Sequence, residues 1–298
     1  MNSNYKVKYI KTKNKLRKII TYNNEELKKE HRFINDKINK YFEPSIFSKG
    51  YTKEQSIYTN AYAHLYNNYF IKTDIKDFFN SVNHNLLRKK VYFELNEIMA
   101  PKDSDIIIEK CTISKKGIPL GLITSPTLSN IYLKSFDKKL YKILKKLDCS
   151  NIIYTRYADD MIISFKECDN PTELYLEIIE TITNLLKDYH LKINSKKTKF
   201  INFNKTRQVK ITGVSIVEKK GIRRLSVGRN QKRKLFYEAI NLKKSKNYDN
   251  NKVKKLKGKL SFYLSIEKIG FEDFITNNMK KELEEFGYTN FIDFMKDL

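Results

Sequence analysis

Apolar and polar residues alternate with a helical period in several parts of the chain. Residues 22–42 place apolar side chains at helical intervals, and residues 84–98 form a further amphipathic stretch. Beyond about residue 229 the pattern is again helical and carries many more lysines. An apolar stripe at this period is typical of a helix that packs one face against a core. We therefore predict helices in all three places.

Two more helices are predicted together with their first residues. Ser125 is suited to cap a helix and Pro126 to occupy its first position, and apolar residues then recur every four positions as far as Leu144. Asn170 and Glu173 stand on either side of a proline and resemble a capping box. Apolar residues follow them at helical spacing, which predicts a second long helix.

Three stretches rich in β-branched and aromatic residues predict strands. They are residues 69–74, residues 152–165 with an Ala-Asp-Asp break that makes them a hairpin, and a run near 199–203. The order strand, helix, helix, hairpin, helix, strand suits an antiparallel sheet with helices packed on one face, which is an α+β layer. We expect this body to occupy residues 1–228, and a small basic helical domain to occupy residues 229–298.

The composition of the 298 residues indicates a globular protein with a polyanionic partner. Apolar residues make up 40%, with 18 Phe and 20 Tyr, which is enough for a core without disulfides or a structural metal. Lys and Arg number 59 against 34 Asp and Glu, a net charge of +25. Such an excess destabilises a compact fold unless a polyanion neutralises it, and nucleic acid is the polyanion we expect. The alternative is a charge that only favours solubility.

The cysteines and the lack of a long apolar run bear on location. Cys111, Cys149 and Cys168 include no CxxC pair and are odd in number, which supports neither a zinc site nor a disulfide framework. No apolar run approaches the ~18 residues of a membrane span, and the basic start lacks the apolar segment of a signal peptide. We expect a cytoplasmic protein without a membrane partner.

Three aspartates are the candidate catalytic residues. Asp159 and Asp160 form the tip of the predicted hairpin, and Asp74 ends the predicted strand 69–74. Two carboxylates this close raise one another's pKa, a cost that a divalent cation removes. A sheet that pairs the strand with the hairpin adds the third carboxylate, and Mg²⁺ takes such oxygen ligands together with substrate phosphates. The alternative is a turn whose aspartates make only local hydrogen bonds.

The sequence around these aspartates resembles that of reverse transcriptases. Four stretches stand in the order of that family's successive polymerase motifs: TDIKDFF at 73–79, GIPLGLITSPTLSN at 117–130, IYTRYADDMIIS at 153–164 and LKINSKKTKF at 191–200. The resemblance narrows to the bacterial retron reverse transcriptases, which carry an NAxxH element before the first catalytic Asp and a VTG element after the fourth motif. Here these elements read NAYAH at 60–64 and ITG at 211–213.

The resemblance extends from about residue 14 almost to the C-terminus. It implies a right-hand polymerase, with fingers, palm and primer-grip region over 1–228 and a helical thumb over 229–298. Two positions depart from the family pattern. Ile211 replaces a valine, which is a mild change, and Leu120 stands where most members have a glutamine that offers a polar contact near the incoming nucleotide.

The resemblance also implies the chemistry of the three aspartates. Two Mg²⁺ ions, or Mn²⁺ in their place, would be held by Asp74 and Asp159, with Asp160 assisting. The ions would activate the primer hydroxyl and stabilise the pyrophosphate leaving group, because phosphoryl transfer depends on positioning and charge stabilisation.

Four more residues are expected to bind the incoming dNTP. Phe79 resembles the family's steric gate against a 2′-hydroxyl, although an isolated Phe is also a core residue. Asp77 would lie near the triphosphate, or be the first-turn acid of a following helix. Lys197 would offset developing negative charge on the triphosphate, or be a solvated lysine. Arg17 would act in a similar way.

Other residues are expected to contact nucleic acid. Asn60 and His64 would orient an RNA or brace the fingers against the palm, with a purely structural role as the alternative. Gly213 would mark a close approach of the primer, or a bulge. Basic residues among aromatics near the C-terminus suit a helix laid along a nucleic-acid backbone. They are Arg229, Lys232, Arg233 and Lys257.

The resemblance implies an RNA-directed DNA polymerase that binds a structured noncoding RNA and copies part of it into single-stranded DNA. In retrons synthesis begins at a 2′-hydroxyl of the same RNA, so the product is branched, and the setting is defence against phage with a separately encoded effector protein. Two alternatives remain: an abortive-infection type polymerase that needs no template, and an RNA-binding scaffold whose polymerase fold is catalytically idle.

Overall fold

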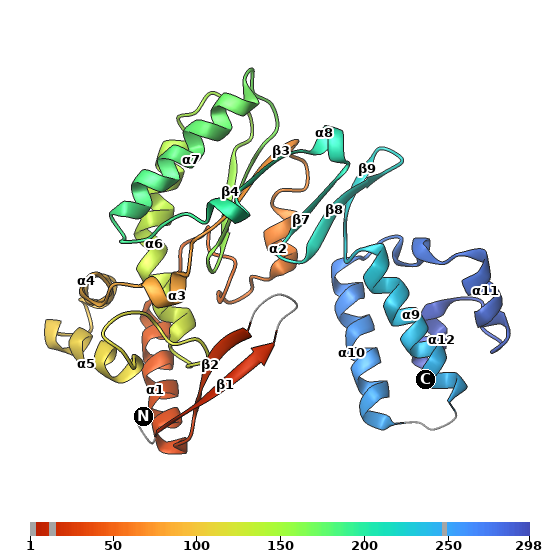
Figure 1. Ribbon diagram of the computed structural model, residues 1–298, viewed down its shortest axis with the longest axis horizontal. Helices are drawn as coiled ribbons and strands as arrows, with labels where there is room; N and C mark the ends of the chain where they lie inside the picture. The colour runs from red at the N-terminus through yellow and green to blue at the C-terminus, as the bar shows by residue number, and fades with distance from the viewer. Residues whose placement is uncertain (1–3, 12–15, 246–248) are drawn as a thin grey trace. The chain divides into compact units, whose positions relative to one another are not determined.

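The computed structural model describes residues 4–11, 16–245 and 249–298 of the chain (Figure 1). By their internal contacts they divide into two compact units. The first unit comprises Met1–Ser56 and Asn67–Asn202, and the second comprises Ile57–Tyr66 and Phe203–Leu298. No helix in this described part of the chain is long and apolar enough to cross a membrane.

A four-stranded antiparallel sheet lies at the centre of the first unit. In spatial order its strands are β4 (Ile153–Tyr157), β5 (Asp160–Phe165), β3 (Tyr69–Asp74) and β6 (Lys199–Asn202). The hairpin predicted from the Ala-Asp-Asp break is the β4–β5 pair, and both remaining predicted strands are confirmed. Because β3 pairs with β5, its last residue ends beside the tip of the hairpin.

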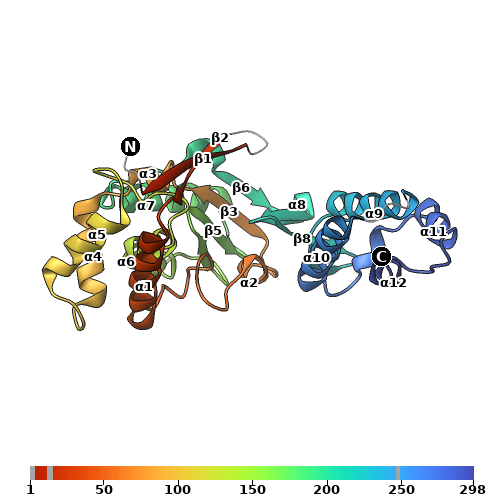
Figure 2. The ribbon, with the colours of Figure 1, turned by 90° about the horizontal axis from the view of Figure 1, so that it is seen from below.

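Helices pack on this sheet and around it. They are α1 (Glu25–Tyr41), α3 (Phe78–Ser81), α4 (His84–Leu95), α5 (Pro101–Cys111), α6 (Ser125–Leu144) and α7 (Pro171–Lys187), with a 3₁₀ turn η1 (Ser195–Lys197). Figure 2 shows α4 and α5 side by side. The helices predicted over 22–42 and 84–98 are α1 and α4.

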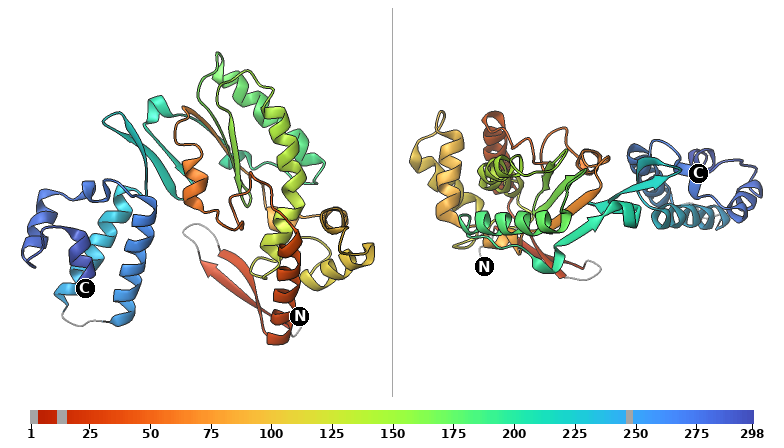
Figure 3. Two further views of the ribbon diagram at one scale, coloured as in Figure 1. Left: turned by 180° about the vertical axis from the view of Figure 1, so that it is seen from behind. Right: turned by 90° about the horizontal axis from the view of Figure 1, so that it is seen from above.

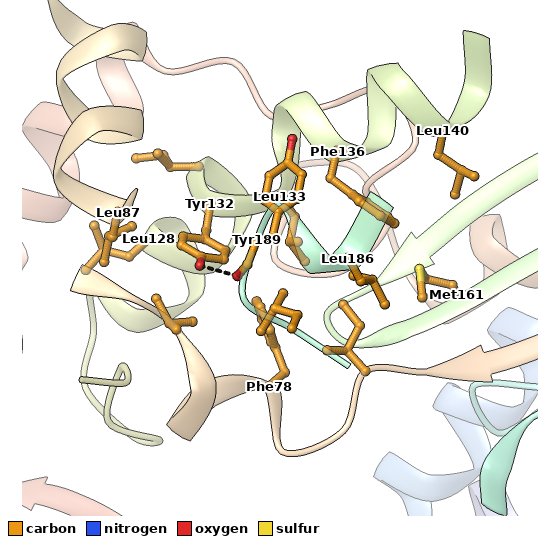
Figure 4. Packing of buried hydrophobic residues seen from close by; sticks show 14 of the residues in the cluster. Phe78, Leu87, Leu128, Tyr132, Leu133, Phe136, Leu140, Met161, Leu186 and Tyr189 are labelled. Atoms are coloured by element: carbon orange, nitrogen blue, oxygen red, sulfur yellow. Dashed lines mark hydrogen bonds between the residues drawn. The ribbon is translucent and has the colours of Figure 1, made fainter. Parts of the chain in front are cut away.

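One apolar core joins the long helices to the sheet (Figure 4). Phe136 and Leu140 of α6 share this core with Met161 of β5 and Leu186 of α7. The buried Tyr132 hydroxyl of α6 donates to a carbonyl beyond the end of α7 at 2.7 Å, so its polar group is satisfied. This arrangement confirms the predicted α+β layer of helices on an antiparallel sheet.

Two helix starts differ from the prediction in detail. The N-cap of α6 is Thr124, one residue earlier than predicted, and the Ser125 hydroxyl donates to the carbonyl of Pro119 at 2.6 Å. Asn170 does precede α7, but its amide donates to the Glu173 carboxylate at 2.8 Å and caps no backbone N–H. The predicted capping box is therefore replaced by a side-chain hydrogen bond.

A two-stranded ribbon precedes α1, and the apolar pattern did not predict it. It pairs β1 (Tyr5–Lys11) with β2 (Leu16–Tyr22) and stands as a separate hairpin in Figure 3. Most of its side chains are exposed. One hydrogen bond, 2.8 Å from the Ile20 N–H to the Leu120 carbonyl, ties β2 to the loop before α6.

The second unit combines a small sheet with a group of helices. Its antiparallel sheet runs β7 (Gln208–Ile211), β8 (Val214–Lys219), β9 (Ile222–Ser226). Its helices are α2 (Ile57–Tyr62), α8 (Phe203–Thr206), α9 (Arg229–Lys244), α10 (Asn250–Ile266), α11 (Asn277–Glu284) and α12 (Phe291–Lys296), with a 3₁₀ turn η2 (Phe271–Phe274). Figure 1 shows α9 and α10 side by side.

The helices after residue 229 have an apolar core of their own. Its buried members lie between Leu235 and Met295, and Phe236, Phe274 and Phe291 meet at its centre. The predicted basic segment is therefore helical, as expected. The domain division at residues 228 and 229 stays a prediction, because the contacts group β7 to β9 with these helices.

Candidate active site

Three aspartates meet where β3 ends beside the β4–β5 turn. Asp74 is the register partner of Asp160 across the β3–β5 pair. The N–H of Ile75, which follows Asp74, donates to the Asp159 carbonyl at 3.0 Å. Paired residues of neighbouring antiparallel strands lie about 5 Å apart. The sheet therefore gathers the three carboxylates that the sequence placed far apart.

Arg156 and Gly50 contact the turn that carries Asp159. Ala158 has a left-handed backbone (φ +56°), and its carbonyl accepts a 3.0 Å hydrogen bond from the buried Arg156 guanidinium. A Cβ atom on Gly50 would lie 2.8 Å from the Ala158 nitrogen, so only glycine allows this approach. The turn is therefore fixed before any ligand binds.

Both carboxylate oxygens of Asp74 have partners. The Lys197 Nζ is 2.6 Å from Oδ2, and the Asn194 amide donates to Oδ1 at 2.8 Å. The Asn194 N–H also donates to the Asp74 carbonyl at 2.7 Å, which fixes the start of η1 against the end of β3. Lys197, predicted from the fourth motif, is thus brought directly to the candidate catalytic aspartates, with 54% of its side chain exposed.

The electrostatics of the site favour a cation. Burial, followed by the charges of Asp74 and Asp160, raises the pKa of Asp159 to about 6. Burial and the charge of Asp74 also raise the pKa of Asp160. Burial alone would lower the pKa of Lys197, but its hydrogen bond to Asp74 and the nearby carboxylates outweigh burial and raise it. The site therefore holds more negative charge than one lysine neutralises.

The donor set fits a hard divalent cation. Carboxylate oxygens from three aspartates are the ligands that Mg²⁺ prefers, together with substrate phosphates. Within the described ranges, no three His, Cys, Asp or Glu side chains already converge around one metal position. Lys197 and Asn194 each donate to one Asp74 oxygen, so a cation at this carboxylate would compete with the Lys197 ammonium for it.

A cavity of about 580 Å³ opens in front of Asp74 and Asp159. Its volume falls within the range of ligand pockets, roughly 300–1,000 Å³. The four residues predicted to bind the dNTP all line it: Arg17, Asp77, Phe79 and Lys197. The structure thus brings these side chains together, and their individual roles stay predictions.

Two of these residues have well-defined local surroundings. Asp77 precedes α3 with a left-handed backbone (φ +48°), makes no side-chain cap, and accepts a 2.7 Å hydrogen bond from the Asn80 amide. Phe79 is half-buried, packs against the core beside Phe78, and also lines the cavity. The Phe79 ring therefore packs against the core and also forms part of the cavity wall.

The loop that departs from the family pattern is held by its backbone. The Leu120 carbonyl accepts the hydrogen bond from Ile20 of β2, and Leu120 lines the cavity. Gly121 adopts φ +105°, and a Cβ there would lie 2.4 Å from the Ile20 carbonyl oxygen. The backbone at 120 and 121 therefore fixes β2, which carries Arg17, at the cavity without a glutamine side chain.

Lys232 corrects one expectation about nucleic-acid contacts. Its residue is 3% exposed, and its Nζ lies 2.6 Å from the Glu267 carboxylate and donates to the Phe271 carbonyl at 2.9 Å. A buried ammonium with these partners does not reach a phosphate. Lys232 instead ties α9 to the chain after α10.

The expectation that Asn60 and His64 contact an RNA is also corrected. Both side chains are completely buried, so they do not reach an RNA. The Asn60 amide donates to the Thr212 hydroxyl at 3.0 Å, so the NAYAH and ITG elements meet inside the second unit. Gly213 has φ +96° and follows Thr212 at φ +44°, which makes a two-residue turn between β7 and β8 in place of a bulge.

The remaining predicted nucleic-acid contacts stay open. Apart from the two neighbours of Gly213 in the chain, no atom of the described residues lies within 4 Å of a Cβ built on it, and a primer approach there remains a prediction. Arg229 and Arg233 are exposed on α9. Lys257 is half-buried on α10 and its Nζ donates to the Lys296 carbonyl at 2.8 Å. The two arginines are accessible to a phosphate backbone, and the contact of Lys257 stays a prediction.

Sequence reasoning missed the residues that support the site from within. Arg156 and Asp137 form a buried ion pair beneath the turn, and Asn194 orients Asp74. An arginine inside the apolar run IYTRY was the available signal, because a charge in a buried strand requires a partner. The partner itself, on α6, was not visible in the pattern.

Comparisons with known proteins agree with this geometry. The family model "Reverse transcriptase (RNA-dependent DNA polymerase)" matches residues 8–216. Retron Ec86 reverse transcriptase of Escherichia coli is 28% identical over 238 residues, which covers 80% of this chain and 68% of that protein. Retron Ec83 reverse transcriptase of Escherichia coli is 27% identical over 249 residues, covering 81% of this chain and 73% of that protein.

Solved structures show the same fold. Apo telomerase from Candida tropicalis, truncated from its C-terminal domain, has a TM-score of 0.51 at 18% identity and covers 72% of this chain. Telomerase from Candida tropicalis bound to a fragment of telomeric RNA has a TM-score of 0.54 at 15% identity and covers 95%. The chain spans 53% and 57% of these two telomerase chains. With the family model matching well over half of its length, the chain belongs to the reverse transcriptases, the RNA-dependent DNA polymerases, and its curated relatives are retron enzymes.

Proposed function

We propose that this reverse transcriptase binds a structured noncoding RNA and copies part of it into single-stranded DNA, starting from a 2′-hydroxyl of the same RNA. The observation that carries the proposal is the cluster of Asp74, Asp159 and Asp160, of which Asp74 and Asp159 line a cavity together with Phe79 and Lys197. The NAYAH and ITG elements support the retron assignment, because the structure joins them through Asn60 and Thr212.

Each residue of the site would have its own role in nucleotide transfer. Asp74 and Asp159 would hold Mg²⁺, which when bound activates the attacking hydroxyl and stabilises the leaving pyrophosphate. Asp160, beside Asp74, adds negative charge that favours the cation. Lys197, now bound to Asp74, would release this carboxylate and neutralise the triphosphate. Phe79 narrows the cavity where a ribose 2′-hydroxyl would enter.

The partners follow from charge and chemistry. A net charge of +25 suits an RNA and its DNA product, whose phosphates neutralise it. The cavity in front of the aspartates would admit dNTPs. The relatives are retron reverse transcriptases of a bacterium. From the retron resemblance we also propose a bacterial cytoplasmic setting in defence against phage, together with a separately encoded effector protein.

Sequencing of the bound nucleic acid tests the proposal. The full chain is purified from its host, and the nucleic acid that copurifies is sequenced with and without RNase treatment. We expect a DNA strand joined to a single RNA species through a 2′,5′ linkage. Bulk RNA with no DNA would support the catalytically idle scaffold and overturn the proposal.

The Asp159→Ala variant separates the remaining alternatives. We expect DNA synthesis to disappear in this variant while the RNA still copurifies. DNA synthesis that continues unchanged would contradict the assignment of the active site. DNA made by the wild-type chain in the absence of the RNA would support the template-independent polymerase.

A further inference from the structure

Three tyrosines recur every four residues along α2 and the turn that follows it in the second unit. Tyr58 and Tyr62 lie on α2, and Tyr66 follows in the turn after it. The opposite side of α2 is anchored, because Asn60 and Ala61 are completely buried and α2 contacts β7, β8 and β9. Tyr62 is 51% exposed and Tyr66 is 66% exposed. A short, well-anchored helix therefore presents large aromatic rings to solvent.

The first two rings are already arranged as a stack. The ring centroids of Tyr58 and Tyr62 lie 5.6 Å apart, and their planes differ by only 12°. The Lys268 ammonium lies over the Tyr58 ring, 5.3 Å from its centroid. A parallel pair of rings on a fixed helix loses little conformational entropy when a further flat ring is added.

The charges around Tyr58, Tyr62 and Tyr66 favour nucleic acid over other partners. Residues 57–66 contain no Asp or Glu, and Lys268, whose ammonium lies over Tyr58, is exposed. Stacking on an aromatic face accepts any base, because every base has a π-face, and a neighbouring cation holds the phosphate. A protein partner of this face would have to contact the same tyrosine rings, and it would lack the phosphate groups that the lysine can bind.

We propose that Tyr58, Tyr62 and Tyr66 form a stacking surface for unpaired bases of a single-stranded nucleic acid. The inference rests on the proposed function only in taking nucleic acid as the ligand class. It also reassigns the NAYAH element: Asn60 anchors the helix through Thr212, and Tyr62, the exposed residue between Asn60 and His64, contacts the ligand.

The test compares binding of bases with binding of backbone. The full chain, freed of copurifying nucleic acid, is titrated into fluorescently labelled oligoadenylate RNA, its DNA equivalent, and an abasic strand of the same length. In the double variant Tyr62→Leu, Tyr66→Leu we expect binding of the base-carrying strands to weaken about tenfold or more, the loss of one or two stacked bases. Binding of the abasic strand should stay unchanged, because the phosphate contacts are intact.

Two controls keep the outcome specific. Tyr62→Phe, which keeps the ring, should bind as the wild type does. Tyr41→Leu removes an isolated tyrosine of matching exposure, 49%, which also has a lysine over its ring, and it should have no effect. A larger loss on RNA than on DNA would identify the template as the occupant, and the reverse would identify the product.

The proposal and the enzymatic function fail in different ways. Unchanged binding of the base-carrying strands by the double variant overturns the stacking surface, even if that face binds a protein. Equal losses on abasic and base-carrying strands overturn it as well, because the tyrosines would then act through the backbone or the fold. A wild-type chain that binds none of the strands contradicts the proposed function itself.

Discussion

The guanidinium of Arg156 forms a completely buried, two-bond ion pair with the carboxylate of Asp137. Nε lies 2.8 Å from Oδ1 and Nη2 lies 2.8 Å from Oδ2, while the Tyr154 hydroxyl donates to the same Oδ1 at 2.7 Å. The third guanidinium nitrogen donates to the Ala158 carbonyl, one residue before Asp159, a proposed catalytic residue. A charge pair in the core thus contacts the turn that carries Asp159.

Arg156→Met should therefore affect both stability and activity. Removing one partner of a buried pair leaves the other charge uncompensated, which costs about 3–5 kcal/mol of unfolding free energy. The Ala158 carbonyl also loses its donor, so the initial rate of DNA synthesis by the folded protein should fall. Urea unfolding measures the first effect, and assays under conditions where the variant is folded measure the second.

The double variant Arg156→Met, Asp137→Leu gives the control for stability. It removes both charges, so it should recover part of the unfolding free energy without recovering activity. Asp188→Asn, which breaks an exposed ion pair with Lys139, should change neither the unfolding free energy nor the activity. Full activity in Arg156→Met would show that the turn does not depend on the guanidinium.

The carboxyl of Asp159 makes stability depend on pH. Its pKa is raised from 3.8 to about 6 by burial and by the charges of Asp74 and Asp160. Its contribution to stability is fully present below 3.8 and is lost as the pH rises through about 6. Asp159→Asn stays neutral, so without divalent cations it should be more stable than the wild type by about 3 kcal/mol near neutral pH, because the pKa rises from 3.8 to about 6 on folding.

Unfolding free energies measured across this pH range check the prediction. The gap between Asp159→Asn and the wild type should close as the pH approaches 3.8. Added Mg²⁺ should raise the melting temperature of the wild type more than that of the variant, because a ligand stabilises the state that binds it. A gap that is the same at every pH would rule out the Asp159 carboxyl as its source.

Lys197 tests the charge at the mouth of the cavity. Lys197→Met removes the ammonium that lies 2.6 Å from Asp74, and we expect kcat/KM for dNTPs to fall by about 10²-fold, as for other lost electrostatic stabilisers. Lys197→Arg should retain much of the activity. The neighbouring Lys196→Met is the matched control, since Lys196 is exposed in the same 3₁₀ turn. Equal kinetics of Lys197→Met and Lys196→Met would contradict the prediction.

Phe79 should decide between ribose and deoxyribose. Phe79→Val leaves room beneath the sugar, so incorporation of rNTPs relative to dNTPs should rise by about tenfold or more, the effect of about one to two methylene-sized contacts. Competition assays with one primer and template measure the ratio. Phe78→Leu alters the adjacent, fully buried ring and should lower stability while the ratio stays the same.

The sequence predicted the elements whose apolar periodicity reflects burial, and with them the site that these elements position. Asp74, Asp159 and Asp160 lie where the predicted strand and hairpin pair. The β1–β2 ribbon escaped prediction because most of its side chains are exposed, so no alternation marks it.

Contacts between distant segments were the part that the pattern did not reveal. Lys232 looks like any surface lysine until Glu267, 35 residues later, is placed beside it. Asn60 and Thr212 are 152 residues apart, so their hydrogen bond exists only in the fold. Charge and motif thus indicated what kind of residue was present, while burial decided what each one does.

Gly121→Ala is the last test. A second glycine with positive φ serves as its control and separates the cost of backbone strain from the cost of a steric clash. Gly121 and Gly213 both have positive φ, so alanine at either position should lose about 1 kcal/mol of stability through backbone strain. Only at Gly121 would the added Cβ also strike a neighbour, the Ile20 carbonyl at 2.4 Å. Gly121→Ala should therefore destabilise more than Gly213→Ala, as measured by urea unfolding.

The same clash predicts a kinetic difference. Displacement of β2 moves Arg17, which lines the cavity in front of Asp74. Gly121→Ala should therefore raise KM for dNTPs, whereas Gly221→Ala, at another positive φ in the β8–β9 turn, should leave that KM unchanged. An unchanged KM in Gly121→Ala, together with equal stabilities of Gly121→Ala and Gly213→Ala, would show that β2 is free to move away from the loop, and that its place at the cavity does not depend on this contact.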